Sequence, residues 1–452
     1  MAFVFYDLET TGTDTRHDQI LHFAAIRTDA ELNEEDRVEL RCRLDRHVVP
    51  HPEALVLTRR SLEEVRHPAL PSHYEMMVRV ARRLEGWSPA TVVGFNSIRF
   101  DEEMLRHALW RTLHDPYLTS RNGNVRADAL TLCRTVAFLT PGALEVPVDA
   151  DGRPRFTLEL LSRSNGLGVT GSHAAMNDAE ATLGLCRLVM RRDGETWSRF
   201  LRFASKAATA ALIDSGQPFG AVRFRGNEPR AAAAVLVGRP ALDFNRRYCL
   251  DLSHDPDVLE GVADVDLRSL LSRSDGPVFR LRVNACPAVC ELWDLPHGLR
   301  GGVDDGTCEV RAARLTADGP LVTRVMPILE ELDRTRQTSE YLEEQLYDAL
   351  PEPVDVHLLR RFHQVDWADR VALLPRLVDP RTRRLGRRLI HLEASGALPV
   401  ETRKRFDAEI AGRLGAPAGS VPYRTVADAL AAARDMRARC PPSLVAALAA
   451  LA

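Results

Sequence analysis

The chain has 452 residues, enough for two or three domains, and its 45% hydrophobic content is ordinary for a folded protein. Its formal net charge of −3 does not by itself indicate a nucleic-acid-binding protein, nor does it exclude a local basic groove. No apolar run approaches the ~20 residues needed to cross a bilayer, and no signal-peptide pattern is visible at the start. We therefore expect no membrane segment and a cytoplasmic location.

The first segment, residues 1–190, alternates strand-like and helix-like patterns. FVFYDLE (3–9) and HFAAIRTD (22–29) predict neighbouring strands of a hairpin, and ATVVGFN (90–96) predicts a buried strand. Helical periodicity covers residues 78–87, 101–113 and 179–192. In the second of these helices the apolar residues predict a single core face: Met104, Leu105, Ala108, Leu109. The mixture predicts an α/β layer.

The remainder of the chain divides into two further segments. Between 194 and 334, short alternating runs predict a small β-rich domain: GAVRFRG, AAVLVG, RRYCLDLS and VFRLRVNA. From 339 to 452 the pattern predicts helices over residues 339–350, 357–365, 401–415 and 425–440, with Gly415 as a C-cap.

The eight cysteines lack paired CxxC spacing, which favours reduced, partly buried thiols and a reducing compartment. The stretch CPAVC, from Cys286 to Cys290, with Cys308 downstream leaves a zinc site as the alternative.

Two carboxylates lie one residue apart in the first predicted strand. Residues i and i+2 of a strand point to the same face, so Asp7 and Glu9 present their oxygens side by side. Such close like charges raise each other's pKa unless a cation neutralises them. A hard divalent ion such as Mg²⁺ or Mn²⁺ suits these ligands. An edge strand with both side chains in water is the alternative.

Three later residues are candidates for the same site. Asp101 opens a predicted helix, where an acid is also favoured by the helix dipole alone. His173 and Asp178 are five positions apart, which on one helix separates their directions by about 140°. Both can face one site if His173 lies in the loop and Asp178 on the helix. Taken singly, His173 is equally typical of an ordinary surface or core histidine.

Together, DLE at 7–9, FNSIRFD at 95–101 and HAAMND at 173–178 resemble the DEDDh exonucleases of the RNase H-like fold. Further stretches at 94–117, 155–167, 282–289 and 339–350 resemble the exodeoxyribonuclease I family of bacterial single-strand DNA exonucleases. The resemblance implies an RNase H-like exonuclease domain with a mixed sheet (1–190), an SH3-like domain (194–334) and a helical C-terminal domain (339–452).

The resemblance also implies a mechanism and a substrate. Two Mg²⁺ ions, for which Mn²⁺ can substitute, would be held by the acidic residues Asp7, Glu9, Asp101 and Asp178, and His173 would be the general base. The activity implied is 3′→5′ degradation of single-stranded DNA to 5′-mononucleotides in DNA repair or recombination. The implied partner is the acidic C-terminal tail of single-strand DNA-binding protein, and we expect a monomer.

The sequence gives fewer signals for residues that contact DNA than for the acidic site residues. Glu9 is a candidate for substrate contact as well as metal binding. The family can carry Asp where this chain has Ala174, and Arg where it has Thr157. Thr157 cannot make the charge-assisted phosphate contact of an arginine. Arg199 and Arg202, in a segment that also contains Trp197, are candidates for the DNA backbone, although a solvated helix face is the alternative.

Two other functions fit parts of the pattern. One is an RNA or proofreading 3′→5′ exonuclease of the same superfamily, against which the ~260 residues after the catalytic domain argue. The other is a non-catalytic single-strand DNA-binding module that keeps the fold, against which the complete set of five site residues argues.

Overall fold

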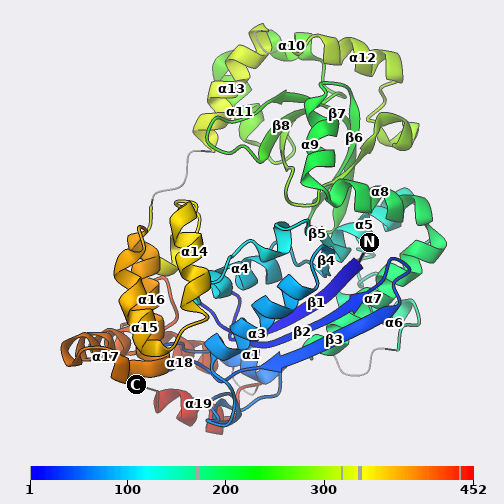
Figure 1. Cartoon of the computed structure of the whole chain (residues 1–452). Coiled ribbons are helices and arrows are strands. Elements are labelled where there is room, and N and C mark those ends of the chain that lie inside the picture. Colours follow the sequence, from blue (N-terminus) through cyan, green and yellow to red (C-terminus); the bar gives the residue numbers. More distant parts are fainter. Residues whose placement is uncertain (1, 169–173, 317–318, 334–337, 437–438, 452) are drawn as a thin grey trace. The chain divides into compact units, whose positions relative to one another are not determined.

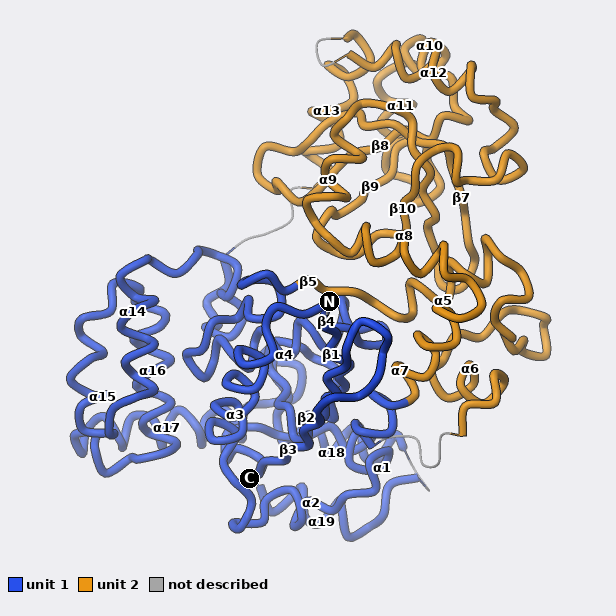
Figure 2. The backbone as a smooth tube through the Cα atoms, turned by 45° about the vertical axis from the view of Figure 1, so that its right-hand side comes forward, with its two compact units in different colours: residues 1–124, 170–180, 338–452 blue, residues 125–169, 181–337 orange. Residues whose placement is uncertain are grey.

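The computed structural model describes residues 2–168, 174–316, 319–333, 338–436 and 439–451. The chain divides into two compact units (Figure 2). Unit 1 comprises residues 1–124, 170–180 and 338–452, and unit 2 comprises residues 125–169 and 181–337. The predicted division into three domains, at 190/194 and 334/339, stays a prediction. None of the helices in the described ranges combines the length and apolar character required to cross a membrane.

Unit 1 begins with a mixed sheet covered by helices (Figure 1). Its N-terminal elements are β1 (Ala2–Thr10), β2 (Ile20–Thr28), β3 (Glu34–Arg41), α1 (Pro52–Leu57), α2 (Leu62–Val65), α3 (His73–Gly86), β4 (Ala90–Gly94), α4 (Asp101–Arg111) and the 3₁₀ helix η1 (Leu118–Ser120). Its C-terminal elements are the 3₁₀ helix η4 (Leu342–Glu344), α14 (Pro353–Phe362), α15 (Trp367–Leu373), α16 (Pro380–Ala394), α17 (Val400–Gly415), α18 (Val426–Asp435) and α19 (Pro442–Ala449), with η5 (Leu374–Arg376) and η6 (Ser395–Ala397) between helices.

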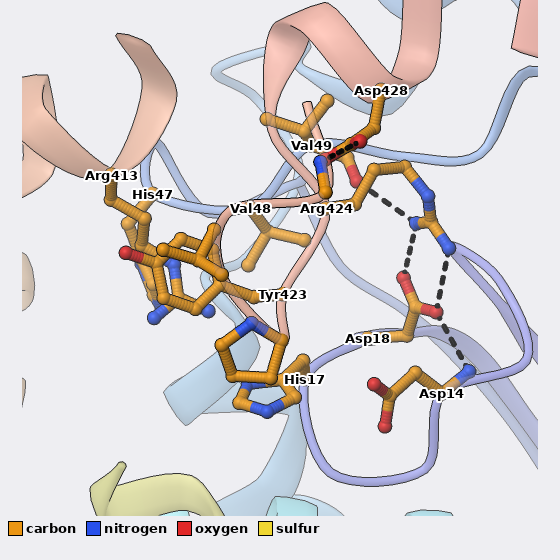
Figure 3. A pocket seen from close by; sticks show the side chains of 13 residues that line it. Asp14, His17, Asp18, His47, Val48, Val49, Arg413, Tyr423, Arg424 and Asp428 are labelled. Atoms are coloured by element: carbon orange, nitrogen blue, oxygen red, sulfur yellow. Dashed lines mark hydrogen bonds and ion pairs between the residues drawn. The ribbon is translucent and has the colours of Figure 1, made fainter. Parts of the chain in front are cut away.

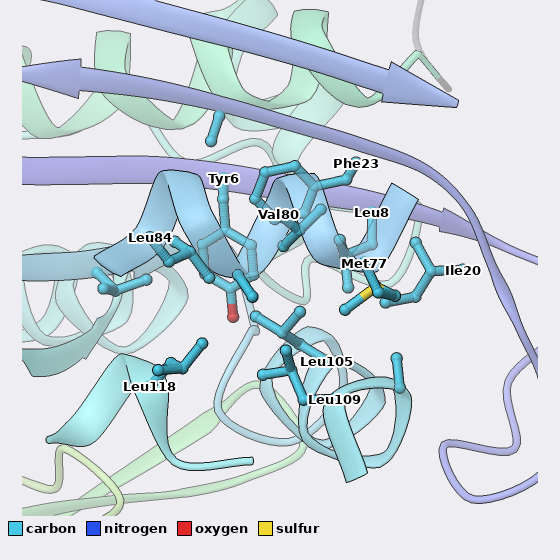
Figure 4. Packing of buried hydrophobic residues seen from close by; sticks show 14 of the residues in the cluster. Tyr6, Leu8, Ile20, Phe23, Met77, Val80, Leu84, Leu105, Leu109 and Leu118 are labelled. Atoms are coloured by element: carbon cyan, nitrogen blue, oxygen red, sulfur yellow. The ribbon is translucent and has the colours of Figure 1, made fainter. Parts of the chain in front are cut away.

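The sheet of unit 1 runs in the order β3-β2-β1-β4. β1 is antiparallel to β2 and parallel to β4, so the prediction of a mixed sheet with a hairpin at its start is confirmed. Alternate residues of β1 point to one face and pack on α3 and α4: Val4, Tyr6 and Leu8 (Figure 4). The opposite alternation therefore places Asp7 and Glu9 together on the other face.

Helix α4 buries more of its surface than the single core face that the sequence predicted. Besides its apolar residues, the polar side chains of Glu102, Arg106 and His107 are buried. Arg106 Nε donates to Glu102 Oε1 at 2.8 Å, and Arg106 also contacts the Tyr347 hydroxyl. Residues distant in sequence thus cover the face that periodicity assigned to water.

The C-terminal helices of unit 1 pack directly on its N-terminal elements. Tyr74 and Trp110 share a core with residues of α14 to α16, such as Phe362. Leu21 and Leu44 share another core with α18 and α19. The prediction of a helix over 339–350 is wrong, because only η4 forms there. Tertiary contacts override local propensity in this segment, where the Glu343 carboxylate is turned inward. Gly415 is the last residue of α17, and Ala416 is its C-cap.

Unit 2 contains an antiparallel sheet in the order β10-β6-β7-β8-β9. The strands of this sheet are β6 (Phe219–Arg225), β7 (Glu228–Gly238), β8 (Arg246–Asp251), β9 (Val278–Arg282) and β10 (Ala288–Glu291). Strand β5 (Val125–Asp128) also falls within the residues of unit 2 but is not part of this sheet. Its helices are α5 (Ala129–Leu139), α6 (Leu158–Ser164), α8 (Gly194–Ala204), α9 (Lys206–Asp214), α10 (Pro256–Glu260), α11 (Asp264–Ser272), α12 (Asp305–Ala313) and α13 (Pro320–Leu332), with 3₁₀ turns at η2 (Leu292–Asp294) and η3 (His297–Leu299). Helix α7 (Ala175–Arg192) begins in unit 1 and ends in unit 2.

The short alternating runs between 194 and 334 do form strands, but this region is richer in helices than predicted. Helices α8 to α13 lie among the strands, and α11 and α13 share a buried core with β7 and β8. The residues of the opposite alternation pack with Phe203 of α8 and Ile213 of α9, so helices cover both faces of this sheet.

Candidate active site

The last residues of β1 carry the first two site carboxylates. Asp7 lies opposite Ala24 of β2, and Glu9 lies opposite His22. The register shifts between Glu9 and Thr10, and such irregularities re-aim side chains at the ends of strands. Asp7 and Glu9 therefore emerge together where the ladder of the hairpin is interrupted.

Asp178 joins this pair from a segment far along the chain. It lies in the first turn of α7. Ligand atoms of Asp7, Glu9 and Asp178 all lie within 4.8 Å of one another, and each of the three residues is partly exposed. Oxygen ligands from three carboxylates at this separation suit a hard divalent cation.

Asp101 is the first residue of α4 and is buried. No side chain caps this helix at its N-cap, Phe100. The charge of Asp101 acts on Asp7, because it is among the causes that raise the Asp7 pKa. The structure thus brings the fourth predicted acid into electrostatic range of Asp7.

The acids of the cluster repel one another. Burial raises the pKa of the Asp7 carboxyl well above its usual value, and the charges of Asp101 and Asp178 raise it further. Burial likewise raises the pKa of Glu9 to about 7, helped by Asp178 and opposed by Arg60. A bound divalent cation would reverse these shifts by favouring the ionised forms. The donor set and its electrostatics therefore both fit a metal centre.

His173 lies outside the described residues, so its predicted role stays a prediction. The description resumes at Ala174, whose carbonyl accepts hydrogen bonds from the backbone N–H groups of Asn177 (2.8 Å) and Asp178 (3.2 Å).

A loop of residues 11–19 follows Glu9 and is held by an ion pair that the sequence did not reveal. Arg424 donates to both oxygens of Asp18, at 2.7 and 3.2 Å (Figure 3). Asp18 also accepts from the Thr11 hydroxyl at 2.7 Å and from the Asp14 backbone N–H at 2.9 Å. Asp14, Asp18 and Arg424 border a cavity of about 260 Å³. The two partners are 406 positions apart, and no local motif marks either one.

A second unpredicted group supports the helix that carries Asp101. Glu102, which is 1% exposed, accepts a hydrogen bond from the Thr119 hydroxyl at 2.6 Å in addition to that from Arg106. The Tyr347 hydroxyl donates to Glu103 Oε2 at 2.6 Å. The first turn of α4 is therefore anchored through both Glu102 and Glu103.

The predicted DNA-contact residues outside the cluster all lie in unit 2. Thr157 is the N-cap of α6, where its hydroxyl accepts from the Leu160 backbone N–H at 3.4 Å. Arg199 pairs with Asp294 at 3.1 Å, and Arg202 pairs with Glu291 at 2.6 Å. Neither carboxylate was foreseen. Contact of these three residues with DNA stays a prediction.

The eight cysteines are free and buried, including Cys286, Cys290 and Cys308. Burial raises the pKa of Cys286 and Cys290 to about 12, which disfavours the thiolate that zinc requires. Among the described residues, the acidic cluster is the one group whose ligand atoms are close enough to hold a metal ion.

Comparison with known proteins agrees with this geometry. Residues 4–186 match the RNase_T family model, described as Exonuclease. This range contains every acid of the cluster, so fold and site define the class: the chain carries an exonuclease domain.

Relatives that match over most of the chain share one name. The chain is 29% identical to exodeoxyribonuclease I of Haemophilus influenzae over 369 residues, which are 77% of this chain and 76% of that protein. It is 29% identical to exodeoxyribonuclease I of Escherichia coli over 408 residues, 85% and 84% of the two chains. The exonuclease I structure from Methylocaldum szegediense superposes with a TM-score of 0.85 at 27% identity, covering 100% of this chain and 98% of that one. The chain is thus a homologue of exodeoxyribonuclease I.

Proposed function

We propose that this protein is a 3′→5′ exonuclease that degrades single-stranded DNA to 5′-mononucleotides in DNA repair or recombination. The observation that carries the proposal is the convergence of Asp7, Glu9 and Asp178, with ligand atoms within 4.8 Å of one another, inside an exonuclease domain. The relatives named exodeoxyribonuclease I support the substrate class. So does a structure of E. coli exonuclease I with a dT13 oligonucleotide, which has a TM-score of 0.83 at 25% identity and covers 100% of this chain and 98% of that one.

The metal of the proposed site is Mg²⁺, two ions per site, with Mn²⁺ as a substitute. Asp7, Glu9, Asp101 and Asp178 would hold them, as an all-oxygen set of ligands that magnesium prefers. When bound, the ions supply positive charge to the attacking and leaving oxygens of the phosphodiester.

The residues of the chain have distinct roles in this proposal. Asp7 and Glu9 are ionised in the working enzyme, although burial and mutual repulsion raise their pKa without a cation. Glu9 also contacts the terminal nucleotide. His173 takes the proton of the attacking water, an effect typically worth ~10²–10⁴ in rate. The anchored first turn of α4 holds Asp101 in position. This matters because a displaced catalytic group loses much of its effect on the reaction rate.

In this proposal, residues of unit 2 bind the DNA strand. Arg199 and Arg202 would exchange their carboxylate partners for phosphates, while Thr157 offers a neutral hydroxyl. We also propose that the sheet β6–β10 is the SH3-like domain and that the protein is a cytoplasmic monomer. Its proposed partner is the acidic tail of single-strand DNA-binding protein. A structure named for SSB and exonuclease I, with a TM-score of 0.80 at 24% identity, contributes only the likeness of its fold.

The test is nucleotide release from 5′-labelled single-stranded DNA, duplex DNA and RNA in the presence of Mg²⁺. Single-stranded DNA should be shortened from its 3′ end in one-nucleotide steps, and the Asp178→Ala variant should bind it without cleavage. Preference for RNA, or for the 3′ end of a duplex, would replace our proposal with an RNA or proofreading exonuclease. Binding without cleavage by the unmodified protein would replace it with a non-catalytic DNA-binding module.

A further inference from the structure

Helices α16 and α17 border a hollow of about 490 Å³ in unit 1. Four arginines line it, and it also contains one acid and one aromatic side chain: Arg383, Arg384, Arg387, Arg405, Glu409 and Phe406. The hollow lies outside the acidic cluster, because no lining residue belongs to β1, α4 or α7. Both helices are at the C-terminal side of unit 1 (Figure 1).

The arginines of this hollow differ from their neighbours on α16 in how they are paired. Arg381 pairs with Asp379, and Arg388 pairs with Glu343, each at 2.8 Å. Within the hollow, Arg384 lies 3.7 Å from Glu409. Across the described parts of the chain, no ion pair joins Arg383, Arg387 or Arg405 to a carboxylate. The fold therefore pairs Arg381 and Arg388 closely, and it leaves Arg383, Arg387 and Arg405 without a carboxylate partner in the described parts of the chain.

The unpaired positive charges on α16 are unfavourable for the helix. Arg383 lies in the first turn of α16, which contains no acid, and a positive charge there opposes the helix dipole. Arg383 and Arg387 are four positions apart on one helix, so their like charges repel each other. Because three guanidiniums border one hollow at a cost to the helix, the charge is better explained by an anionic ligand than by stability.

We infer that the hollow binds phosphates of the DNA strand at a distance from its 3′ end. Guanidinium groups match phosphate oxygens in fork-like pairs. Phe406 is 3% exposed, so the hollow offers no open ring on which a base could stack. The site therefore holds the backbone and reads no sequence.

The inference rests on the proposed function, which brings a polyanion to this unit in every reaction. A single strand carries one negative charge per nucleotide and can engage three neighbouring guanidiniums at once. Arginine forks also bind carboxylates, so an acidic peptide is the rival ligand and forms one arm of the test.

The test compares two triple variants of the full chain. R383Q/R387Q/R405Q removes the uncompensated charges of the hollow. R66Q/R79Q/R82Q is the matched control: it removes three exposed arginines of α2, α3 and their surroundings that are likewise without an ion pair in the described ranges. Circular dichroism melts check that both fold. Binding of labelled oligothymidylates of about 6 and about 40 nucleotides, lengths chosen around single-strand site sizes, is measured by fluorescence anisotropy in EDTA.

The hollow variant should bind the long strand about tenfold more weakly, and the slope of log K against log[salt] should fall by about 2, because each phosphate contact to a single strand contributes about 0.7. Its affinity for the short strand should equal that of the control. Equal affinity and slope for the long strand in both variants would overturn the inference. So would loss of binding to a labelled oligoglutamate peptide with DNA binding unchanged. Because binding is measured without turnover, absence of Mg²⁺-dependent cleavage by the parent would count against the proposed function and not against the hollow.

Discussion

Two groups of acids in unit 1 show that the charges around a carboxylate decide whether its pKa is raised or lowered. In the cluster at the end of β1, Asp7 is surrounded by further carboxylates, and burial with their charges raises its pKa. Glu343 has less exposed surface than the partly exposed Asp7, at 4% exposure, and it accepts from Arg388 and Arg413, each at 2.8 Å. Burial alone would raise the pKa of Glu343, yet these two guanidiniums lower it well below its usual value.

This difference distinguishes a site that needs a bound ligand from an ion-pair cluster that only stabilises the fold. The Glu343 group is electrostatically complete, because its charge is matched within the chain. The acidic cluster is incomplete, and a cation must come from outside to balance it. The following predictions test this contrast.

Substitution Asp7→Asn should have the largest effect. Exonuclease activity should fall by about 10³-fold or more, because the metal ions lose a carboxylate ligand and with it the charge stabilisation that they supply to the phosphate. Without divalent metal at pH 8, the variant should melt at a higher temperature than the parent, since the repulsion from Asp101, Asp178 and Glu9 is removed. Activity within tenfold of the parent, measured by nucleotide release, would exclude Asp7 from the site.

Substitution Glu343→Gln should lower the stability of the protein, where Asp7→Asn raises it. Removing one partner of a buried ion pair leaves two guanidiniums uncompensated, so the free energy of unfolding in urea should fall by about 3 kcal/mol. The matched control is Glu401→Gln, which breaks the exposed pair with Lys404 (83% and 69% exposed) and should leave stability unchanged. Equal effects of the two variants would contradict the distinction between the two environments.

Substitution Arg424→Gln tests whether the ordered loop after β1 matters to the cluster. The change removes the guanidinium that holds Asp18, so kcat should fall by about tenfold through misplacement of Glu9, with little change in KM. A double-mutant cycle with Asp18→Asn should show strong coupling, because the two residues are in contact. Additive effects on kcat would mean that the pair acts on folding alone.

The smallest effect is expected in the pH dependence of stability. The pKa of Glu9 is raised from 4.5 to about 7 in the folded protein, so its contribution is complete below pH 4.5 and is lost as pH rises through 7. Glu9→Gln should therefore gain stability relative to the metal-free parent between pH 5 and 8. Saturating Mg²⁺ should reverse the difference, because it binds only the folded parent tightly. A difference that stays constant with pH would contradict the raised pKa.

The sequence predicted the features that depend on local periodicity. The two-residue period of β1 already placed Asp7 and Glu9 on one face, and the hairpin and the helix over 179–192 followed from similar patterns. The mixed sheet came from the family resemblance. Asp101 and Asp178 became members of the same site only through family resemblance, since a helix-initial acid has a local explanation as well. Their convergence depends on the sheet, which no short window contains.

The features that the sequence did not predict depend on distant partners. The burial of Arg106 and Glu102 on α4 comes from Thr119 and Tyr347, so helical periodicity underestimated the core. Glu343 lies in a segment predicted to be helical, but its ion pairs with α16 and α17 hold a short 3₁₀ turn instead. Contacts between side chains that are far apart in the sequence produce no periodic pattern along the chain.

The ion pair between Asp18 and Arg424 has a consequence for synthesis on the ribosome. Its halves are 406 positions apart, so at a translation rate of about 5–20 residues per second the loop beside Glu9 waits about 20–80 s for its anchor. The last helices also complete a core with Leu21 and Leu44. A nascent chain therefore emerges with its acidic residues already made but with the loop beside Glu9 not yet anchored, which delays hydrolysis until Arg424 and the helices after it have been synthesised.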